Sequence, residues 1–307
     1  MSEQRSVHVN CNCVLNHSIP NRNLESQHFV NRRGNSLHRT KLTLFTIIAF
    51  LLGGCFSFEL VPIATPASPP TSVPSPTTTP NIGWQTIAPG LERRNYDPDP
   101  LNPITRMVAL RIDPALYSFR AHYQPGQAHT TVEWAMALPQ AAAFVNANYF
   151  DPSDVALGLL VTAGVVYGHS YRDRGGTFLV QNGQPRIRAN LREPYQGEPL
   201  EQAVQAFPML VLDGLAAFTD TIQDRTTRRT IVAQDSSGRI ILLATPVLGL
   251  TLRDLSAYLP TTDMNIITAF NLDGGRSTMM VINTDGSPET IVGSVDAVPA
   301  VLAVYPR

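Results

Sequence analysis

The chain has 307 residues, a formal net charge of −1, 43% hydrophobic residues and three cysteines. This balance hides an asymmetry: residues 1–54 carry six basic and two acidic side chains, a net +4, whereas the remainder carries 17 arginines and 22 acidic side chains, a net −5. A mildly acidic body lacks the basic patch that nucleic-acid binding requires, so no nucleic-acid partner is expected. Because the cysteines are Cys11, Cys13 and Cys55, the body forms neither an internal disulfide nor a cysteine-rich zinc site.

The N-terminal segment has the ordered parts of an export signal. Arg39 and Lys41 precede an apolar run over residues 42–52, which is too short to span a bilayer but suits a signal-peptide core. The run ends in Leu52-Gly53-Gly54-Cys55, which resembles the lipobox of bacterial lipoproteins, in which the cysteine is lipidated. We therefore predict a leader and lipoprotein-type signal peptide over residues 1–54 and a membrane anchor at Cys55. The alternative is a short anchor beside an incidental cysteine.

Residues 55–83 form a different kind of segment. They are rich in proline, threonine and serine, with seven prolines between Pro62 and Pro80. Such a composition favours extended polyproline conformations and buries too little apolar surface to fold. We predict a tether that holds an exported domain away from the membrane of a bacterial cell envelope.

Residues 84–307 are long enough for one sizeable core, and we expect a single globular domain there. Short apolar runs bounded by turn residues predict strands. These runs are Met107–Ile112, Phe144–Tyr149, Leu157–Tyr167, Phe178–Val180, Met209–Leu212, Ile231–Ala233, Ile240–Ala244, Ile266–Phe270, Met279–Ile282 and Val301–Tyr305. Hairpin turns are predicted at residues 181–183, 236–238 and 283–286.

Three short helices are expected. They are residues 131–138, which Thr130 or Thr131 caps, residues 200–207, and residues 251–259, where Thr251 and Asp254 form a capping-box-like pair. Because these helices do not alternate regularly with strands, a doubly wound sheet is disfavoured. We predict an α+β fold with a large mixed or antiparallel sheet and few short helices.

The strongest local signal for chemistry is Asn271-Leu272-Asp273-Gly274-Gly275, which follows an apolar strand and continues into Arg276, Ser277 and Thr278. A carboxylate at a strand end serves as a base, a nucleophile or a metal ligand. Adjacent glycines let the backbone approach a ligand, and their amides form anion-binding nests. The alternative interpretation is an ordinary Asp-Gly-Gly hairpin turn.

Three other segments have the same pattern of an apolar strand that ends in polar residues. Asn146 and Asn148 share one face of a strand by period two, and Asp213 follows the run Met209–Leu212. Three arginines within residues 225–229 precede the strand at Ile231. Each segment taken alone is better explained by a turn or by a solvated charge than by a functional role.

Taken together and in order, these motifs resemble the phosphodiester glycosidase family over about residues 106–305. The resemblance rests on Asn146-Ala147-Asn148-Tyr149-Phe150, Gly158-Leu159-Leu160-Val161, Gly168, Ala206-Phe207-Pro208-Met209-Leu210-Val211, Gly214, Arg229-Thr230-Ile231, Gly249-Leu250-Thr251-Leu252-Arg253-Asp254-Leu255, Asn271–Thr278 and Val298-Pro299-Ala300. The chain departs from the family at two places. Asn146–Phe150 stands where the family has Asn-Gly-Gly-Tyr-Phe, and Arg229–Ala233 where it has Arg-Thr-Ala-Ile-Gly. The fold therefore transfers more safely than the substrate.

The resemblance implies a hydrolase that cleaves a sugar 1-phosphodiester at the anomeric carbon of a glycan or glycoconjugate. It gives Asp273 the role of base or nucleophile, and Arg229 and Arg276 the role of holding the phosphate. The other expected substrate-binding residues are Asn146, Asn148, Asp213, Asn271, Gly274, Gly275, Ser277 and Thr278. No cofactor is expected, because a divalent metal at Asp273 and Asp213 has no support from their spacing.

Two other classes of function remain open at this point. A non-catalytic glycan-binding module of the cell envelope would use the same pocket without turnover. A peptidase or esterase is disfavoured, since the body has neither a Gly-x-Ser-x-Gly elbow nor a cysteine nucleophile.

Overall fold

The structure is a computed structural model that describes residues 83–222, 224–283 and 286–307. The predicted signal peptide, the lipidation site Cys55 and nearly all of the predicted tether lie outside the described residues. In the part of the chain that is described, no helix has both the length and the apolar character needed to cross a membrane.

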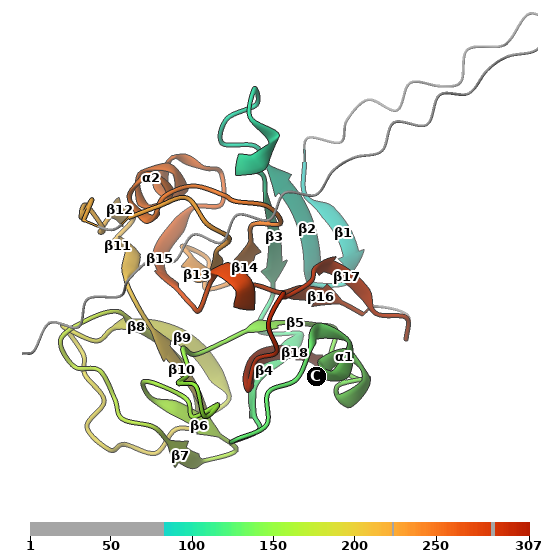
Figure 1. Cartoon of the computed structure of the whole chain (residues 1–307), viewed down its shortest axis with the longest axis vertical. Coiled ribbons are helices and arrows are strands. Elements are labelled where there is room, and N and C mark those ends of the chain that lie inside the picture. The colour runs from blue at the N-terminus through green and yellow to red at the C-terminus, as the bar shows by residue number, and fades with distance from the viewer. Residues whose placement is uncertain (1–82, 223, 284–285) are drawn as a thin grey trace, which may run out of the picture. The chain divides into compact units, whose positions relative to one another are not determined.

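The described residues form three sheets whose strand pairings are all antiparallel (Figure 1). The largest has eight strands in the order β1 (Gln85–Ala88), β2 (Leu91–Tyr96), β3 (Met107–Ile112), β14 (Ile240–Ala244), β13 (Thr230–Asp235), β15 (Ile266–Asn271), β11 (Met209–Leu212) and β12 (Leu215–Ala216). A second sheet has the order β7 (Val165–Tyr167), β6 (Leu160–Thr162), β10 (Gln202–Ala206), β8 (Gly176–Gln181) and β9 (Gln184–Ala189). The third has the order β17 (Glu289–Val292), β16 (Met280–Ile282), β5 (Ala143–Asn146), β18 (Ala300–Pro306) and β4 (Tyr117–Tyr123).

The main core lies where the three sheets face one another. Alternate residues of central strands point into it, among them Val232 and Phe270 of the first sheet, Phe178 of the second and Leu302 of the third. The opposite face of the eight-stranded sheet packs against helix α2 (Leu252–Tyr258), and the opposite face of the third sheet packs against helix α1 (Thr131–Ala137). Each sheet is thus apolar on both faces at its centre, which explains the near-continuous apolar runs in the sequence.

Two of the three predicted helices are confirmed. The Thr130 hydroxyl accepts a hydrogen bond from the Glu133 N–H, and the Glu133 side chain accepts from the Thr130 N–H, so α1 begins with a complete capping box. The Thr251 hydroxyl accepts from the Asp254 N–H and begins α2. The only other helices of the described residues are three 3₁₀ turns, η1 (Pro103–Thr105), η2 (Leu259–Thr261) and η3 (Gly275–Ser277).

The predicted helix over residues 200–207 is wrong, because Gln202–Ala206 is the central strand β10 of the second sheet. Its Val204 and Ala206 point into the main core, while Ala203 packs on the outer face of the sheet. Alanine and glutamine favour helices intrinsically, but pairing with β6 and β8 overrides that weak preference.

The run Leu157–Tyr167, expected as one strand, is the hairpin β6–β7. Ala163 and Gly164, at φ values of 50° and 82°, form its two-residue turn. Helices account for 10% and strands for 41% of the described residues. The expected few short helices and antiparallel pairing are found, but three sheets replace the one large sheet, and the α+β label fits only loosely.

Candidate active site

The site is built at one end of the neighbouring strands β13 and β15. These strands pair with Ile231 opposite Asn271, and Ile231 packs into the core beneath α2. Side chains directly opposite each other share a face of the sheet, so Asn271 lies on the α2 face as well. Arg229 precedes β13 and Asp273 follows β15, so the two predicted catalytic residues meet at this strand end.

A cleft of about 250 Å³ opens there, between the strand ends and the first turn of α2. Its lining residues are Tyr149, Asp224, Arg225, Thr227, Arg229, Leu252, Asn271, Asp273, Gly274 and Gly275. The structure therefore brings together five of the residues expected in the site and adds five that were not assigned a role.

The backbone of Asp273 is held by hydrogen bonds with two residues, Asn146 at the end of strand β5 and Ala147 directly after it. The Asp273 N–H donates to the carbonyl of Ala147 at 3.0 Å, and the Asp273 carbonyl accepts from Asn146 Nδ2 at 2.7 Å. Asn146 Oδ1 in turn accepts from Thr230 Oγ1 at 2.7 Å and from the Met279 N–H at 3.0 Å. Asn146 is almost fully buried with all these bonds made inside the protein. It therefore lies behind the loop Asn271–Gly275 rather than in the cleft.

The Asp273 carboxyl is itself held and shielded. Its Oδ1 accepts from the N–H of Gly274 at 2.8 Å. Burial raises the pKa of Asp273 to about 6, since the surroundings disfavour the charged form, while the Ser277 side chain and the Gly274 N–H oppose that rise. A carboxyl group whose pKa lies near neutrality is suited to taking up and releasing protons.

Arg229 supplies a fixed positive charge in the same cleft. Its Nη2 donates to the carbonyl of Arg225 at 2.8 Å and lies 3.6 Å from Asp224 Oδ1, while Nε has no partner among the described residues. Burial lowers the pKa of Arg229, but a guanidinium stays protonated in proteins. An unpartnered, buried donor on a permanent cation is suited to an anionic ligand.

Asp224 joins the cleft to helix α2. Its Oδ1 accepts from the Leu252 N–H at 2.8 Å and its Oδ2 from the Arg253 N–H at 2.9 Å, and only 4% of the side chain is exposed. These bonds fix the loop before β13 against the start of α2. They also occupy two N–H groups of the helix that would otherwise be free to bind an anion.

Tyr149 forms the wall beside Asn271, and its hydroxyl is used for structure. It donates to the Phe207 carbonyl at 2.8 Å and accepts from Asn271 Nδ2 at 3.0 Å. Burial, with the nearby charge of Asp273, raises the pKa of Tyr149, so the phenol stays neutral. The Tyr149 ring packs on Phe207 with centroids 4.9 Å apart, and Phe207 packs on Tyr171 at 5.4 Å.

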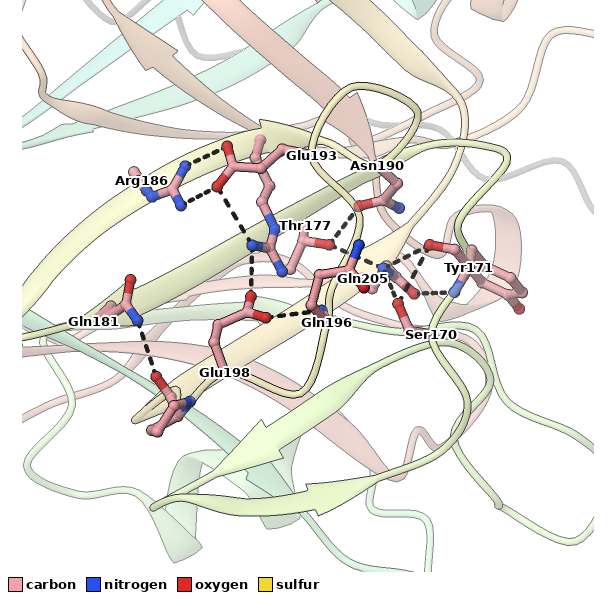
Figure 2. A network of polar contacts seen from close by, with 12 residues as sticks. Ser170, Tyr171, Thr177, Gln181, Arg186, Asn190, Glu193, Gln196, Glu198 and Gln205 are labelled. Atoms are coloured by element: carbon pink, nitrogen blue, oxygen red, sulfur yellow. Dashed lines mark hydrogen bonds and ion pairs between the residues drawn. The ribbon is translucent and has the colours of Figure 1, made fainter. Parts of the chain in front are cut away.

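The rings of Tyr149, Phe207 and Tyr171 form an aromatic row. A buried polar network in the second sheet supports this row (Figure 2). Gln205 of β10 accepts from the Tyr171 N–H at 2.6 Å and donates to Ser170 Oγ at 3.1 Å and Thr177 Oγ1 at 3.0 Å. Asn190 Oδ1 lies 2.6 Å from the same Thr177 hydroxyl. The loop that carries Tyr171 is thereby attached to β8 and β10, which keeps the aromatic row behind Tyr149 in place.

The predicted anion-binding nest of Gly274 and Gly275 is not available. The Gly274 N–H is bonded to Asp273, and the Gly275 N–H donates to the Arg228 carbonyl at 2.7 Å. The glycines are instead needed for close packing and for backbone conformation. A Cβ on Gly274 would lie 2.9 Å from the Arg228 carbonyl oxygen, and Gly275 has a φ of +62°.

Four of the expected substrate-binding residues lie behind the cleft or turn away from it. Asn148 is buried, and its Nδ2 bonds the carbonyls of Leu157, Leu159 and Gln205. Ser277 and Thr278 are buried beneath the loop. The Arg276 guanidinium points to solvent and makes a bidentate ion pair with Asp296 at 2.6–2.9 Å.

Asp213 lies outside the site. It forms an exposed turn after β11, ion-paired with Arg192 at 2.7 Å, and the next residue, Gly214, bonds the Ile267 carbonyl. Ile267 is four residues before Asn271, roughly 14 Å along the strand. Asp213 and Asp273 therefore do not form the metal pair considered from the sequence, and the described residues contain no cluster of three or more metal-binding side chains.

The sequence held signals for only some of the residues that were missed. Tyr149 stands beside Asn148 in a motif already noted, and Arg225 belongs to the arginine cluster before β13. Leu252 likewise belongs to a motif already noted, Gly249–Leu255. Asp224 and Thr227 carried no usable signal, because their place in the cleft depends on contacts between the loop before β13 and helix α2.

With this geometry in hand, the class of protein is clear. The sequence profile of the phosphodiester glycosidase family matches residues 139–305, a span that includes every residue lining the cleft. The chain belongs to this family, whose name denotes hydrolysis of a phosphodiester-linked sugar. The resemblance noted in the sequence is thus confirmed.

Solved structures show the same fold. The zebrafish N-acetylglucosamine-1-phosphodiester alpha-N-acetylglucosaminidase catalytic domain, auto-inhibited by its pro-peptide, aligns with a TM-score of 0.56 at 20% identity, covering 73% of this chain and 86% of that one. A hypothetical protein from Synechocystis aligns with a TM-score of 0.52 at 15% identity, covering 75% of this chain and 64% of that one. At such identities the likeness concerns the fold alone. No curated protein matches the chain significantly.

Proposed function

We propose that the protein hydrolyses a sugar 1-phosphodiester, releasing the free sugar and a phosphate monoester. The observation that carries this proposal is the placement of Asp273, with its raised pKa, and the buried cation Arg229 in one cleft. The first group suits chemistry at the anomeric carbon and the second suits the phosphate.

The reaction breaks the bond between the anomeric carbon and the bridging oxygen, and the electron pair of that bond leaves with the phosphate. The ionised Asp273 carboxylate either takes a proton from the attacking water or attacks the anomeric carbon itself, after which water hydrolyses the intermediate. Either route adds the hydroxyl of water to the sugar. Arg229 and Arg225 stabilise the negative charge that gathers on the departing phosphate.

Most glycosidases need a second carboxyl group as an acid, because an alcohol leaves poorly as an anion. Asp224 is the other carboxylate of this cleft, but both its oxygens accept bonds from the N–H groups of α2 and one lies 3.6 Å from Arg229. Both oxygens of Asp224 are thus engaged with the start of α2 and are not positioned to act on a leaving group. A phosphate monoester is a stable anion, so the reaction proceeds with a single catalytic carboxylate and a cation in place of the acid.

The test uses the full chain with methyl diesters of several sugar 1-phosphates, following release of both the sugar and methyl phosphate. We expect turnover by the wild type, loss of turnover in Asp273→Asn, and little change in Arg253→Lys, a control on the exposed surface of α2. Binding of these diesters without hydrolysis of any of them would reject the proposal and favour a glycan-binding module.

We also propose that the domain acts outside the cell membrane, held by a lipid on Cys55 and a tether over residues 55–83. Support comes from the basic, apolar and small-residue parts of the N-terminal segment in their proper order. In a bacterial host, the wild type should incorporate labelled palmitate and sediment with membranes. If Cys55→Ala does both equally well, the anchor is elsewhere.

A further inference from the structure

The side chains that line the cleft balance in charge. Asp224 and Asp273 contribute two negative charges above pH 7, and Arg225 and Arg229 contribute two positive charges. The remaining lining residues are uncharged, since the pKa of Tyr149 is raised. A site built simply to collect phosphate would carry an excess of positive charge.

The carboxylate of Asp224 is fixed in place. Asp224 has only 4% of its side chain exposed, and bonds of 2.8 and 2.9 Å to the Leu252 and Arg253 N–H groups hold it in place. Its Oδ1 lies 3.6 Å from Arg229 Nη2. A phosphate that binds Arg229 therefore lies within a few ångströms of a fixed carboxylate.

Neighbouring arginines do not restore an excess of positive charge. The Arg228 side chain donates to the carbonyls of Thr278 and Gly293, and Arg276 is ion-paired with Asp296. Neither side chain lines the cleft.

We propose that this balance keeps a doubly charged phosphate monoester from binding more tightly than a singly charged phosphodiester, and that Asp224 sets this charge selectivity. The inference rests on the proposed function in one respect: the diester is then the substrate and the monoester the product. Coulomb energy is proportional to the charge of the ligand, and a phosphate monoester is a dianion above its second pKa of about 6. Attraction by Arg225 and Arg229 doubles from the diester to the monoester, but repulsion by Asp224 and Asp273 doubles with it, so the monoester gains no affinity from its extra charge and is released.

The experiment measures binding to the full chain by NMR titration at pH 8. The probes are dimethyl phosphate, a monoanion, and methyl phosphate, a dianion. Neither contains an anomeric carbon, so binding is measured whether or not the protein is a glycosidase. In the wild type, methyl phosphate should bind no more tightly than dimethyl phosphate, despite its larger charge.

Removing one negative charge from the cleft should change the two affinities unequally. We expect Asp224→Asn to bind dimethyl phosphate about threefold and methyl phosphate about tenfold more tightly, since doubling the ligand charge squares the factor. Asp254→Asn is the matched control, because it removes an exposed carboxylate of helix α2 that lies outside the cleft. It should leave both affinities nearly unchanged.

A second variant covers the case in which Asp224→Asn fails to fold. Arg225 is exposed, and Arg225→Gln should weaken methyl phosphate binding by about the square of its effect on dimethyl phosphate. The inference is overturned if the wild type prefers methyl phosphate, or if a foldable variant shifts both affinities by the same factor. If selectivity is found but no sugar phosphodiester is hydrolysed, the proposed function fails and the charge selectivity stands.

Discussion

The side chain of Asn146 donates a hydrogen bond of 2.7 Å to the backbone carbonyl of Asp273, although the two residues are 127 positions apart in the sequence. Through this bond, strand β5 of the third sheet holds the loop Asn271–Gly275 at the end of strand β15 of the first. The geometry of the candidate active site is thus set where two sheets meet, and changes there should affect stability and activity together.

Replacing Asn146 tests this connection. In Asn146→Ala the Asp273 carbonyl, the Thr230 hydroxyl and the Met279 N–H all lose their buried partner. We expect a loss of about 3 kcal/mol in the free energy of unfolding and a strong fall in kcat, measured by urea denaturation and by turnover. Asn95→Ala, on the exposed face of β2, should change neither quantity appreciably. Wild-type kcat in Asn146→Ala would show that the loop does not depend on this bond.

The pH dependence of turnover should report the raised pKa of Asp273. The carboxylate must be ionised to act as base or nucleophile, and its pKa is about 6. We therefore expect kcat/KM to be constant above about pH 7 and to fall about tenfold per pH unit below 6. Activity that rises as the pH drops from 7 to 5 would instead assign Asp273 the role of an acid.

The same buried charge should weaken the fold. Because the pKa of Asp273 is raised from 3.8 to about 6 in the folded state, its contribution to stability is largest below pH 4 and is lost as pH rises through 6. Asp273→Asn removes the charge and keeps an oxygen that can accept from the Gly274 N–H. At pH 8 the variant should be more stable than the wild type by as much as about 3 kcal/mol. Thermal denaturation at pH 4 and pH 8 checks this, since the gain should disappear at the lower pH.

Arg229→Lys tests whether the cleft needs a planar cation. A lysine keeps the charge but has neither the Nε donor nor the reach to bond the Arg225 carbonyl while facing the cleft. We expect kcat/KM for a sugar phosphodiester to fall about a hundredfold. If Arg229→Lys and the control Arg253→Lys have equal kcat/KM, Arg229 does not contact the phosphate.

The two glycines after Asp273 should respond differently to a methyl group. Gly274→Ala would place a Cβ 2.9 Å from the Arg228 carbonyl oxygen, so the loop must shift, with a loss of about 1–3 kcal/mol and most of the activity. Gly275→Ala would place its Cβ at an ordinary contact distance of 3.6 Å from Thr227 Oγ1, but the residue has a φ of +62°, so we expect a loss of about 1 kcal/mol and a smaller change in activity. Gly238→Ala, in the β13–β14 turn, has the same backbone strain far from the cleft. It should lose stability without losing kcat.

The sequence was a good guide to strands and a poor guide to how they assemble. Apolar runs marked β3, β13, β14 and β15 because each is buried on both faces. The alanine and glutamine residues of Gln202–Ala206 led to the wrong prediction of a helix, because strand pairing there outweighs their intrinsic helix propensity. The division into three sheets was also missed, because it depends on which distant strands pair, as β18 does with β5.

The site was predictable to the extent that its residues follow strands. Asp273 and Arg229 each adjoin a buried strand that is easy to detect, but their roles came from the ordered motifs that resemble the family rather than from either segment alone. Asn146 was expected to bind the substrate, but it lies behind the loop. The alternation of side chains along a strand identifies which residues share a face of the sheet, but not what covers that face. Asp224 carried no local signal, because its role begins with a contact to Leu252, 28 residues later.

Strand β18 has a consequence for how the protein is made. It lies between β4 and β5 in the third sheet and consists of residues 300–306, whereas β5 consists of residues 143–146. On the ribosome, β5 therefore lacks one neighbour until residues 300–306 have been made, and the Asn146 that it carries has no settled strand from which to hold Asp273. The candidate active site is thus completed only when these two distant segments pair, and a chain truncated before residue 300 should lose the proposed activity.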